Sequence, residues 1–266
     1  MYPIVNIFGK EITTYAICAL IGILVSGFYV CRTAKKRGHD DNDFIIFLLI
    51  CSVGVLIGGR VVFALTRMNV IVELITNWSK YVTSFGSFID CMSVVFGGSV
   101  FYGGLIGGMI FGVIYGKIKK LDLSEYANVC APMVPVFLCF GRIGCFLGGC
   151  CYGIESSFGF TAYNNDLIPD LCGVNRFPVQ LLEAGLNFLL FLFLDYLLRK
   201  NKFKGNLFAL YLVIYAVIRF SDEFLRGDQN RGFLFGLSTS QIISIILFVC
   251  GGIYLIRQIV KQRKQI

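Results

Sequence analysis

The sequence has few charged residues for its length. Only 15% of its 266 residues are charged, whereas 56% are apolar or aromatic. A soluble domain carries about 25% charged residues, so the composition disfavours a soluble enzyme as well as a disordered chain. The net charge of +8 comes from basic residues clustered in short segments between apolar runs, which also disfavours nucleic-acid binding. The composition indicates one integral membrane domain over residues 1–266.

Histidine is nearly absent, and the cysteines lack a metal-binding spacing. The single histidine is His39, and none of the 11 cysteines forms a Cys-x-x-Cys pair. Structural zinc sites usually show such pairs at short spacing, so the sequence predicts no metal, and we expect no cofactor. The residues before the first apolar run, MYPIVNIFGKE, lack the basic stretch of a signal peptide, so we expect that run to be a retained helix.

Long apolar runs are what the sequence does contain. A bilayer core of about 30 Å needs about 20 apolar residues in each crossing helix. Seven runs approach this length, at 12–31, 44–65, 94–115, 126–147, 181–198, 207–225 and 239–256. The sequence therefore predicts an all-α polytopic protein with about seven transmembrane helices. We expect outer-side loops at about 68–92, 148–179 and 227–238.

Basic residues are distributed unequally between alternate connections. One set holds fifteen: Arg32, Lys35, Lys36, Arg37, Lys117, Lys119, Lys120, Arg199, Lys200, Lys202, Lys204, Arg257, Lys261, Arg263 and Lys264. The other set holds five: Lys10, Arg67, Lys80, Arg176 and Arg231. Cytoplasmic loops are the Lys/Arg-rich ones, so the N-terminus should lie outside and the C-terminus in the cytoplasm.

Glycine is concentrated in the third run. Gly104, Gly108, Gly112 and Gly116 are four residues apart, and Gly103 and Gly107 adjoin two of them. Small residues at this spacing allow helix backbones to approach closely. We expect packing to explain most of these glycines, and a thin helix also leaves space for a lipid beside it.

Four arginines, Arg60, Arg142, Arg219 and Arg226, lie in or beside apolar runs. Charges at membrane depth are costly and usually face a partner or a cavity. Counting along the helices places Arg60 and Arg142 about 24 Å, and Arg219 about 20 Å, from the cytoplasmic ends. One such arginine could simply extend to the outer headgroups, but three at similar depth predict a shared anion site. Glu223 follows Arg219 by four residues, so the two could also form a structural ion pair.

The segment GRIGCFLGGCCYG at 141–153 places five glycines around one arginine. Glycine lets the backbone approach a ligand closely, and arginine can hold a phosphate through two parallel hydrogen bonds. It is followed by RFPVQLLE at 176–183, where Pro178 suits a helix start.

These two segments, with GGR at 58–60, FYGGLIGG at 101–108 and RFSDEFLR at 219–226, resemble the signature of bacterial prolipoprotein diacylglyceryl transferases. The motifs occur in the family's order and cover the second through seventh runs. The family, in the bacterial plasma membrane, transfers diacylglyceryl from phosphatidylglycerol to the lipobox cysteine thiol of a prolipoprotein. A thioether forms and glycerol phosphate leaves, on the outer-leaflet side.

The resemblance implies roles for particular residues. Arg142 and Arg219 would hold the lipid phosphate, and Glu223 would orient Arg219 or assist proton movement. Substrate-binding positions would be Arg60, Gly103, Gly104, Gly141, Gly144, Cys145, Gly153, Gln180 and Glu183.

Three positions depart from the family's pattern: Tyr102 replaces a histidine, Cys145 an asparagine and Cys150 an acidic residue. A tyrosine, with a pKa near 10, is a poorer thiol base than histidine. Tyr102 lies nine residues into the third run, and we expect it either to bind the phosphate or to relay a proton to Glu183 or Glu223. It is otherwise a packing aromatic.

Several alternatives remain open at this stage. The departures also suit a paralogue that binds phospholipid without catalysis or uses another acceptor, and buried arginines suit an anion transporter. Cys145, Cys150, Cys151 and Cys172 near the outer face suit small packing residues, a disulfide from Cys172 to Cys150 or Cys151, or redox or metal chemistry.

Overall fold

A computed structural model describes residues 3–7, 9–163, 165, 171–203, 205–228, 233–234 and 236–263. Lys204, Arg231 and Lys264, which entered the charge analysis, lie outside these residues. The chain divides into two compact units. The first unit comprises Met1–Thr33 with Ser124–Ile266, and the second unit comprises Ala34–Leu123. Each is described by itself, and the expectation of one domain remains a prediction.

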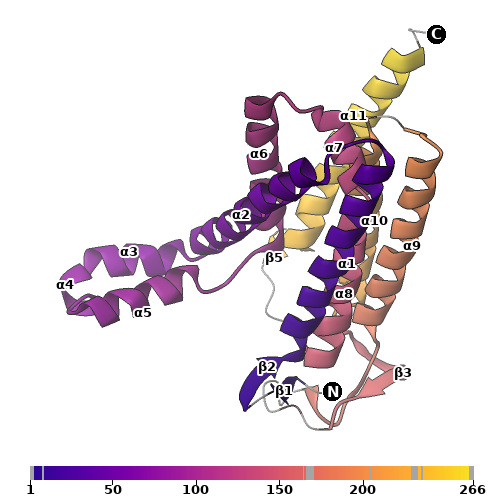
Figure 1. Ribbon diagram of the computed structural model, residues 1–266. Coiled ribbons are helices and arrows are strands. Elements are labelled where there is room, and N and C mark those ends of the chain that lie inside the picture. The colour runs from indigo at the N-terminus through magenta and orange to yellow at the C-terminus, as the bar shows by residue number, and fades with distance from the viewer. Residues whose placement is uncertain are drawn as a thin grey trace. The chain divides into compact units, whose positions relative to one another are not determined.

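The first unit is a helical bundle. Its helices are α1 (Thr14–Lys36, as far as Thr33), α7 (Leu123–Cys130), α8 (Met133–Gly148), α9 (Val179–Arg199), α10 (Leu207–Asp222) and α11 (Thr239–Arg263). In Figure 1, α1, α9 and α11 run away from the end that carries the N-terminal strands, whereas α8 and α10 run towards it. The end of α8, the start of α9 and the end of α10 therefore lie at one end of the bundle.

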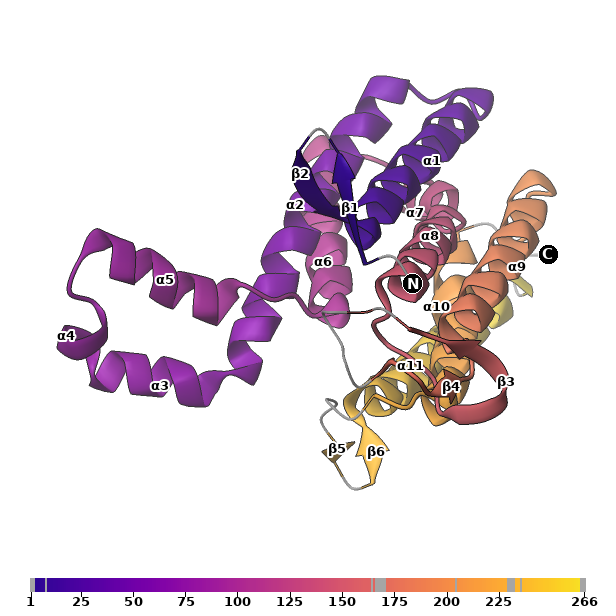
Figure 2. The ribbon, with the colours of Figure 1, turned by 90° about the horizontal axis from the view of Figure 1, so that it is seen from below.

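Short strand pairs precede or connect these helices. They are β1 (Ile4–Ile7) with β2 (Lys10–Thr13), β3 (Glu155–Thr161) with β4 (Asn175–Arg176), and β5 (Phe233–Leu234) with β6 (Leu237–Ser238), all antiparallel. Figure 2 shows β5 and β6 as a small hairpin before α11. The expected loops at 148–179 and 227–238 thus contain short strands, while the fold remains helical.

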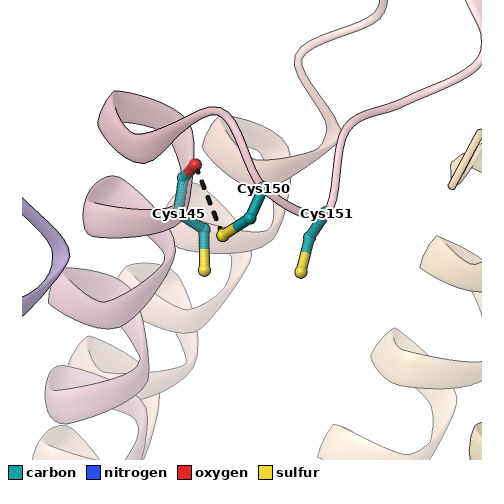
Figure 3. Close-up of side chains that lie close together, drawn as sticks. All are labelled: Cys145, Cys150 and Cys151. Atoms are coloured by element: carbon teal, nitrogen blue, oxygen red, sulfur yellow. Dashed lines mark hydrogen bonds between the residues drawn. The ribbon is translucent and has the colours of Figure 1, made fainter. Parts of the chain in front are cut away.

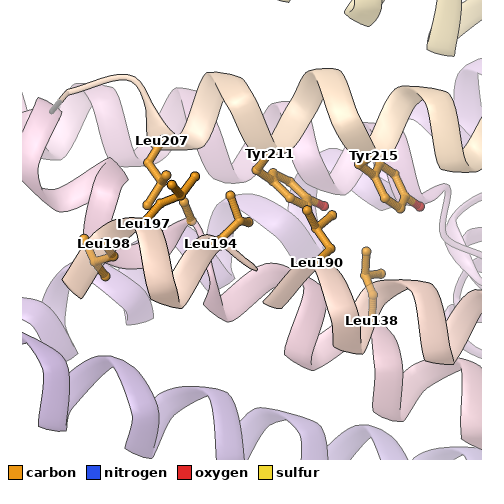
Figure 4. Packing of buried hydrophobic residues seen from close by; sticks show 9 residues of the cluster. Leu138, Leu190, Leu194, Leu197, Leu198, Leu207, Tyr211 and Tyr215 are labelled. Atoms are coloured by element: carbon orange, nitrogen blue, oxygen red, sulfur yellow. The ribbon is translucent and has the colours of Figure 1, made fainter. Parts of the chain in front are cut away.

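Leucine and tyrosine side chains fill the space between α8, α9 and α10 (Figure 4). The rings of Tyr211 and Tyr215 stack with centroids 5.7 Å apart. Across the bundle, Tyr29 Oη of α1 donates to Asp195 Oδ1 of α9 at 2.8 Å. These contacts bury the apolar faces predicted from the runs and fix α8, α9 and α10 side by side.

The second unit contains α2 (Asp41–Thr66), α3 (Met68–Thr76), α4 (Trp78–Tyr81), α5 (Phe85–Phe96) and α6 (Phe101–Lys119). The segment expected as an outer-side loop, 68–92, is occupied by three short helices, and its place outside the membrane remains a prediction. Ser84 caps the N-terminus of α5, because its Oγ accepts a hydrogen bond from Ser87 N at 3.2 Å.

Glycines bring α2 and α6 into backbone contact. A Cβ added at Gly103 would lie 2.5 Å from Gly58 O, and one at Gly107 would collide with Gly54 O. The predicted close packing is confirmed: Gly103 and Gly107 meet backbone carbonyls of α2, and Gly104, Gly108 and Gly112 meet α2 side chains. Gly104 faces Val55.

All seven apolar runs form helices, with three corrected boundaries. The run 126–147 is split between α7 and α8, because Pro132 lacks an N–H and restricts the residue before it. In the run 94–115 the long helix, α6, begins only at Phe101, after the break at Gly97 and Gly98. The run 207–225 changes at Glu223 from α10 to a 3₁₀ turn, η2 (Glu223–Leu225).

Among the described residues, five helical segments are long and apolar enough to cross a membrane. They are Thr14–Lys36, Asn42–Thr66, Leu123–Gly148, Val179–Arg199 and Thr239–Lys261. The protein is therefore an all-α, multi-pass membrane protein by helix length and composition. Seven spans and the orientation of the termini remain predictions.

Candidate functional site

Arg142 and Glu183 form a buried ion pair between α8 and α9. Arg142 Nε lies 2.9 Å from Glu183 Oε1, and the exposed fractions of the two side chains are 16% and 2%. The two groups are close but not aligned as a hydrogen bond, since Glu183 Oε1 has no such partner in the described part of the chain. The structure thus holds two predicted site residues together, with part of Arg142 still accessible.

Arg219 and Glu223 form a second buried pair. Arg219 Nη2 lies 2.7 Å from Glu223 Oε2, which confirms the shared helix face predicted from their four-residue spacing. Arg219 Nη2 also donates to Ser240 Oγ of α11 at 3.1 Å. Arg219 Nη1 is buried and has no hydrogen-bond partner among the residues that the structure describes. Because an unsatisfied buried donor is costly, this N–H is suited to an anionic oxygen.

Asp222 is a polar residue of this region to which the sequence analysis gave no role. Its side chain is 2% exposed, and Oδ2 has no hydrogen-bond partner within the described ranges. It lies within electrostatic reach of Glu183, Arg219 and Arg142. Its position in an apolar helix, three residues after Arg219, is a signal that could have identified it.

The loop after α8 is fixed to the two later motifs by main-chain hydrogen bonds. Ile154 N donates to Leu225 O at 3.0 Å, Phe177 N to Ile154 O at 2.9 Å, and Gly227 N to Tyr152 O at 2.9 Å. We call these three segments, 152–154, 176–177 and 225–227, the backbone frame. It joins the motifs GRIGCFLGGCCYG, RFPVQLLE and RFSDEFLR at one end of the bundle.

Glycine is required in the backbone frame by close approach. A Cβ at Gly153 would collide with Phe177 O, and one at Gly227 would lie 2.5 Å from Gly153 O. The conformational role expected for glycine in this motif therefore holds at Gly153. Its assignment to substrate binding remains a prediction.

Gln180 and Arg176 support the same loop. Gln180 Nε2 donates to Cys150 O at 2.9 Å, and Arg176 Nη1 donates to Gly153 O at 3.4 Å. The Arg176 guanidinium also lies over the Tyr152 ring, 4.5 Å from its centroid. Gln180, predicted to bind substrate, thus has a contact that orients the loop.

The other predicted substrate-binding positions on α8 are Gly141, Gly144 and Cys145. A Cβ at Gly144 would lie 3.0 Å from Cys18 Cβ and 3.2 Å from Tyr15 Cα, so this glycine lets α8 pack on α1. Gly141 has open space around its Cα, and Cys145 is buried. Nothing in these contacts tests a role in substrate binding.

The remaining predicted residues belong to the second unit. Tyr102 is buried and is the second residue of α6, so the expectation that it lies nine residues into its helix is wrong. Gly103 packs against α2 and Gly104 against Val55, as described above. Arg60 is exposed within its unit, next to Gly59, whose carbonyl accepts a hydrogen bond from Val100 N at 3.1 Å. Their participation in one site with Arg142 remains a prediction.

Arg226 is held by a local carboxylate. Its Nε donates to Asp228 Oδ1 at 3.0 Å and its Nη2 to Asp228 Oδ2 at 2.6 Å, a two-point contact. It lies beside the backbone frame, since Gly153 and Arg226 form an isolated antiparallel bridge.

Three cysteine side chains converge at the end of α8 and in the turn that follows it (Figure 3). The sulfur atoms of Cys145, Cys150 and Cys151 all lie within 4.8 Å of one another. Cys150, Cys151 and Cys172 are free thiols, so the disulfide considered for Cys172 is not formed. Packing, the first alternative for these cysteines, stays a prediction, as does redox or metal chemistry.

Comparison with known proteins covers almost the whole chain. The family model described as prolipoprotein diacylglyceryl transferase matches residues 3–257. The chain belongs to the prolipoprotein diacylglyceryl transferase family. It is 33% identical over 252 residues to phosphatidylglycerol–prolipoprotein diacylglyceryl transferase 2 of Clostridium perfringens (strain 13 / Type A), covering 94% of this chain and 92% of that protein.

Two further prolipoprotein diacylglyceryl transferases give the same result. The Clostridium tetani (strain Massachusetts / E88) protein is 32% identical over 254 residues, covering 94% of this chain and 95% of its own length. The Geobacter sulfurreducens (strain ATCC 51573 / DSM 12127 / PCA) protein is 33% identical over 248 residues, covering 91% and 88%. The resemblance identified from the motifs is confirmed, and the anion-transporter alternative loses its support.

Proposed function

We propose that this protein transfers the diacylglyceryl group of phosphatidylglycerol to the lipobox cysteine of prolipoproteins, the first step of lipoprotein maturation. Family membership over nearly the full chain supports a transferase. The substrates come from the names of the relatives, and the chemistry of the described site is suited to a lipid phosphate.

The observation that carries this proposal is the buried Arg219 Nη1, which has no hydrogen-bond acceptor among the described residues. A phosphate oxygen would satisfy it while Glu223 and Ser240 keep the guanidinium in place. Arg142 supplies the second positive charge, oriented by Glu183. Guanidinium groups bind phosphate through directed parallel hydrogen bonds, which suits this pair of arginines.

The arginines act on the leaving group. The peptide thiolate attacks the glycerol carbon that carries the phosphate ester, so a C–S bond forms as the C–O bond breaks. Negative charge develops on the departing glycerol phosphate, where Arg142 and Arg219 stabilise it. Preorganised charges of this kind are usually the largest contribution to such a reaction.

The thiol proton needs an acceptor, and we propose Asp222. Glu183 and Glu223 are each already paired with an arginine, whereas Asp222 Oδ2 is buried without a hydrogen-bond partner among the described residues. Tyr102 retains its proposed role as a donor to the lipid phosphate or as a relay of the proton.

We also propose seven spans, an outside N-terminus and a site in the outer half of the bacterial plasma membrane. Within the first unit, Arg199 ends α9 and Lys261 lies near the end of α11, and both helix ends lie opposite the N-terminal strands (Figure 1). Reporter fusions after Lys36, Lys120 and Lys202 should all report the cytoplasm. An external signal at any of them would contradict this orientation.

The central experiment is a transfer assay with labelled phosphatidylglycerol and a lipobox peptide. Wild-type protein should form the thioether product, and Arg219→Ala should lower the rate roughly 100-fold or more. Arg199→Ala is the matched control, because Arg199 also pairs with a carboxylate, at 2.6 Å from Asp195 Oδ2, but at the other end of the bundle. Equal losses of rate in the two variants would contradict the proposal. So would a wild-type protein that forms no thioether from phosphatidylglycerol and the lipobox peptide. Activity only with another thiol acceptor would identify a paralogue of different specificity.

A further inference from the structure

The convergence of three thiols depends on the turn after α8. Cys145 lies in the last turn of that helix, and Gly149 caps it with φ of 81°, in the left-handed region. Cys151 also has a positive φ, of 55°, which is uncommon for a residue other than glycine. The reversed chain returns Cys150 and Cys151 to Cys145, and Cys150 Sγ lies 3.8 Å from Cys145 O (Figure 3).

The spacing of the sulfur atoms suits a small thiophilic ion. Three sulfurs at about 2.3 Å from a tetrahedral Zn²⁺ lie about 3.8 Å from one another. The observed separations, all within 4.8 Å, require the thiols to close by only about 1 Å, and a cysteine side chain can do this by rotation. Thiolate ligands select Zn²⁺ and Cu⁺ over hard ions such as Mg²⁺.

Two arginine side chains supply positive charge near the thiol cluster. Arg142 lies within electrostatic reach of Cys145 and Cys151, and Arg226 lies within electrostatic reach of Cys151. A Zn²⁺ ion with three thiolates carries a net charge of about −1, which neighbouring guanidinium groups stabilise. The cluster thus combines convergent ligands with compensating charge.

We infer that Cys145, Cys150 and Cys151 form a binding site for one thiophilic metal ion of the Zn²⁺ or Cu⁺ class, coordinated by three thiolates with a fourth position open. Metal binding to the three thiols is measured without any lipid transfer, so its test does not depend on the proposed function. This proposal differs from the expectation of no metal site, which rested on the lack of a usual zinc spacing; Cys-x₄-Cys-Cys is not such a spacing.

The test is a metal titration of the full-length protein in detergent, after reduction and then removal of reductant and metal. Zn²⁺ in competition with a chromophoric chelator should bind with a stoichiometry of one, and Cd²⁺ should produce thiolate charge-transfer absorption. Cys145→Ser, Cys150→Ser and Cys151→Ser should each lower affinity on the order of 100-fold, because each removes one of three ligands. Cys172→Ser, which changes a partly buried free thiol in the same unit, is the matched control and should bind like wild type.

A second measurement does not require the variants to fold. Zn²⁺ should protect Cys145, Cys150 and Cys151 of the wild-type protein from alkylation, as mapped by mass spectrometry, and should leave Cys172 reactive. No saturable binding, equal loss of affinity in Cys172→Ser, or absence of protection would overturn the inference.

Discussion

The two units stabilise their helices in different ways. In the first unit, leucine and tyrosine side chains separate α8, α9 and α10, and charged side chains are buried at one end of the bundle. In the second unit, α2 and α6 meet through glycine backbones. An interface of side chains leaves room for buried polar groups, whereas a backbone interface leaves none. Substitutions of the buried charges in the first unit should therefore affect chemistry, whereas substitutions of the glycines between α2 and α6 should affect stability.

The largest expected effect is the loss of transfer in Arg142→Ala. Without the positive charge of Arg142 beside the leaving glycerol phosphate, the transfer rate should fall about 100- to 1,000-fold. The helix content of the purified protein, measured by circular dichroism, should not change. Arg142→Lys should recover little activity, because an ammonium group cannot reproduce the planar guanidinium fork. Full activity of the lysine variant would mean that only a nearby positive charge is needed.

Asp222→Asn tests the proton acceptor in the first unit. It preserves the shape of the side chain but removes its basicity, so transfer should fall about 100-fold. The matched control is Asp195→Asn, since Asp195 bonds Tyr29 and Arg199 away from the candidate site. A normal rate in Asp222→Asn over the whole pH range would direct the search to Glu183 or Glu223.

In the second unit, Gly107→Ala should lower stability rather than activity per folded molecule. The added Cβ collides with the carbonyl of Gly54, and overpacking of this kind costs about 1–3 kcal/mol. Gly252→Ala in α11 is the matched control, because nothing lies within 4 Å of its added Cβ. Since alanine is the better helix former, thermal unfolding in detergent should shift down for the first variant and should not for the second. If the unfolding temperature fell in both variants, the difference proposed between the two units would be wrong.

Tyr102→Phe is expected to have a smaller effect. It removes one hydroxyl, and a hydrogen bond to a charged group contributes about 1.5 kcal/mol, so transfer should fall roughly tenfold with lipid binding retained. Tyr102→His should stay active with an optimum at lower pH, because imidazole titrates near 6.5. If the phenylalanine variant matches wild type at every pH, Tyr102 is a packing residue of the second unit.

The smallest effect is expected for Cys151→Ser. The peptide supplies the thiol that is alkylated, so Cys151 takes no part in the reaction. The transfer rate of the metal-free protein should change by less than about twofold, which corresponds to the effect of about 0.5 kcal/mol expected for a substitution without a special role. Mass spectrometry of the wild-type protein after turnover is the accompanying check. A diacylglyceryl adduct on Cys151 would indicate a covalent intermediate.

The apolar runs predicted every helix of the bundle because burial in a membrane requires long uninterrupted hydrophobic segments. The four-residue spacing of Arg219 and Glu223 likewise predicted their ion pair. The short helices at 68–96 were missed, since they have neither the length nor the uniform hydropathy of a span. The pairing of Arg142 with Glu183 and the thiol cluster were also missed. The ion pair depends on how α8 packs against α9, and the thiol cluster depends on how the chain reverses after α8, where Gly149 and Cys151 have positive φ angles.

The backbone frame explains how this chain tolerates its unusual residues. Its three segments are held by main-chain donors and acceptors, and Gly153 and Gly227 are the positions whose close contacts demand a particular residue. Cys145 and Cys150 lie outside these three segments, so a change of residue type at either position leaves the main-chain hydrogen bonds of the frame in place. The chain can therefore carry thiols at these two positions while Arg142 and Arg219 keep their carboxylate partners.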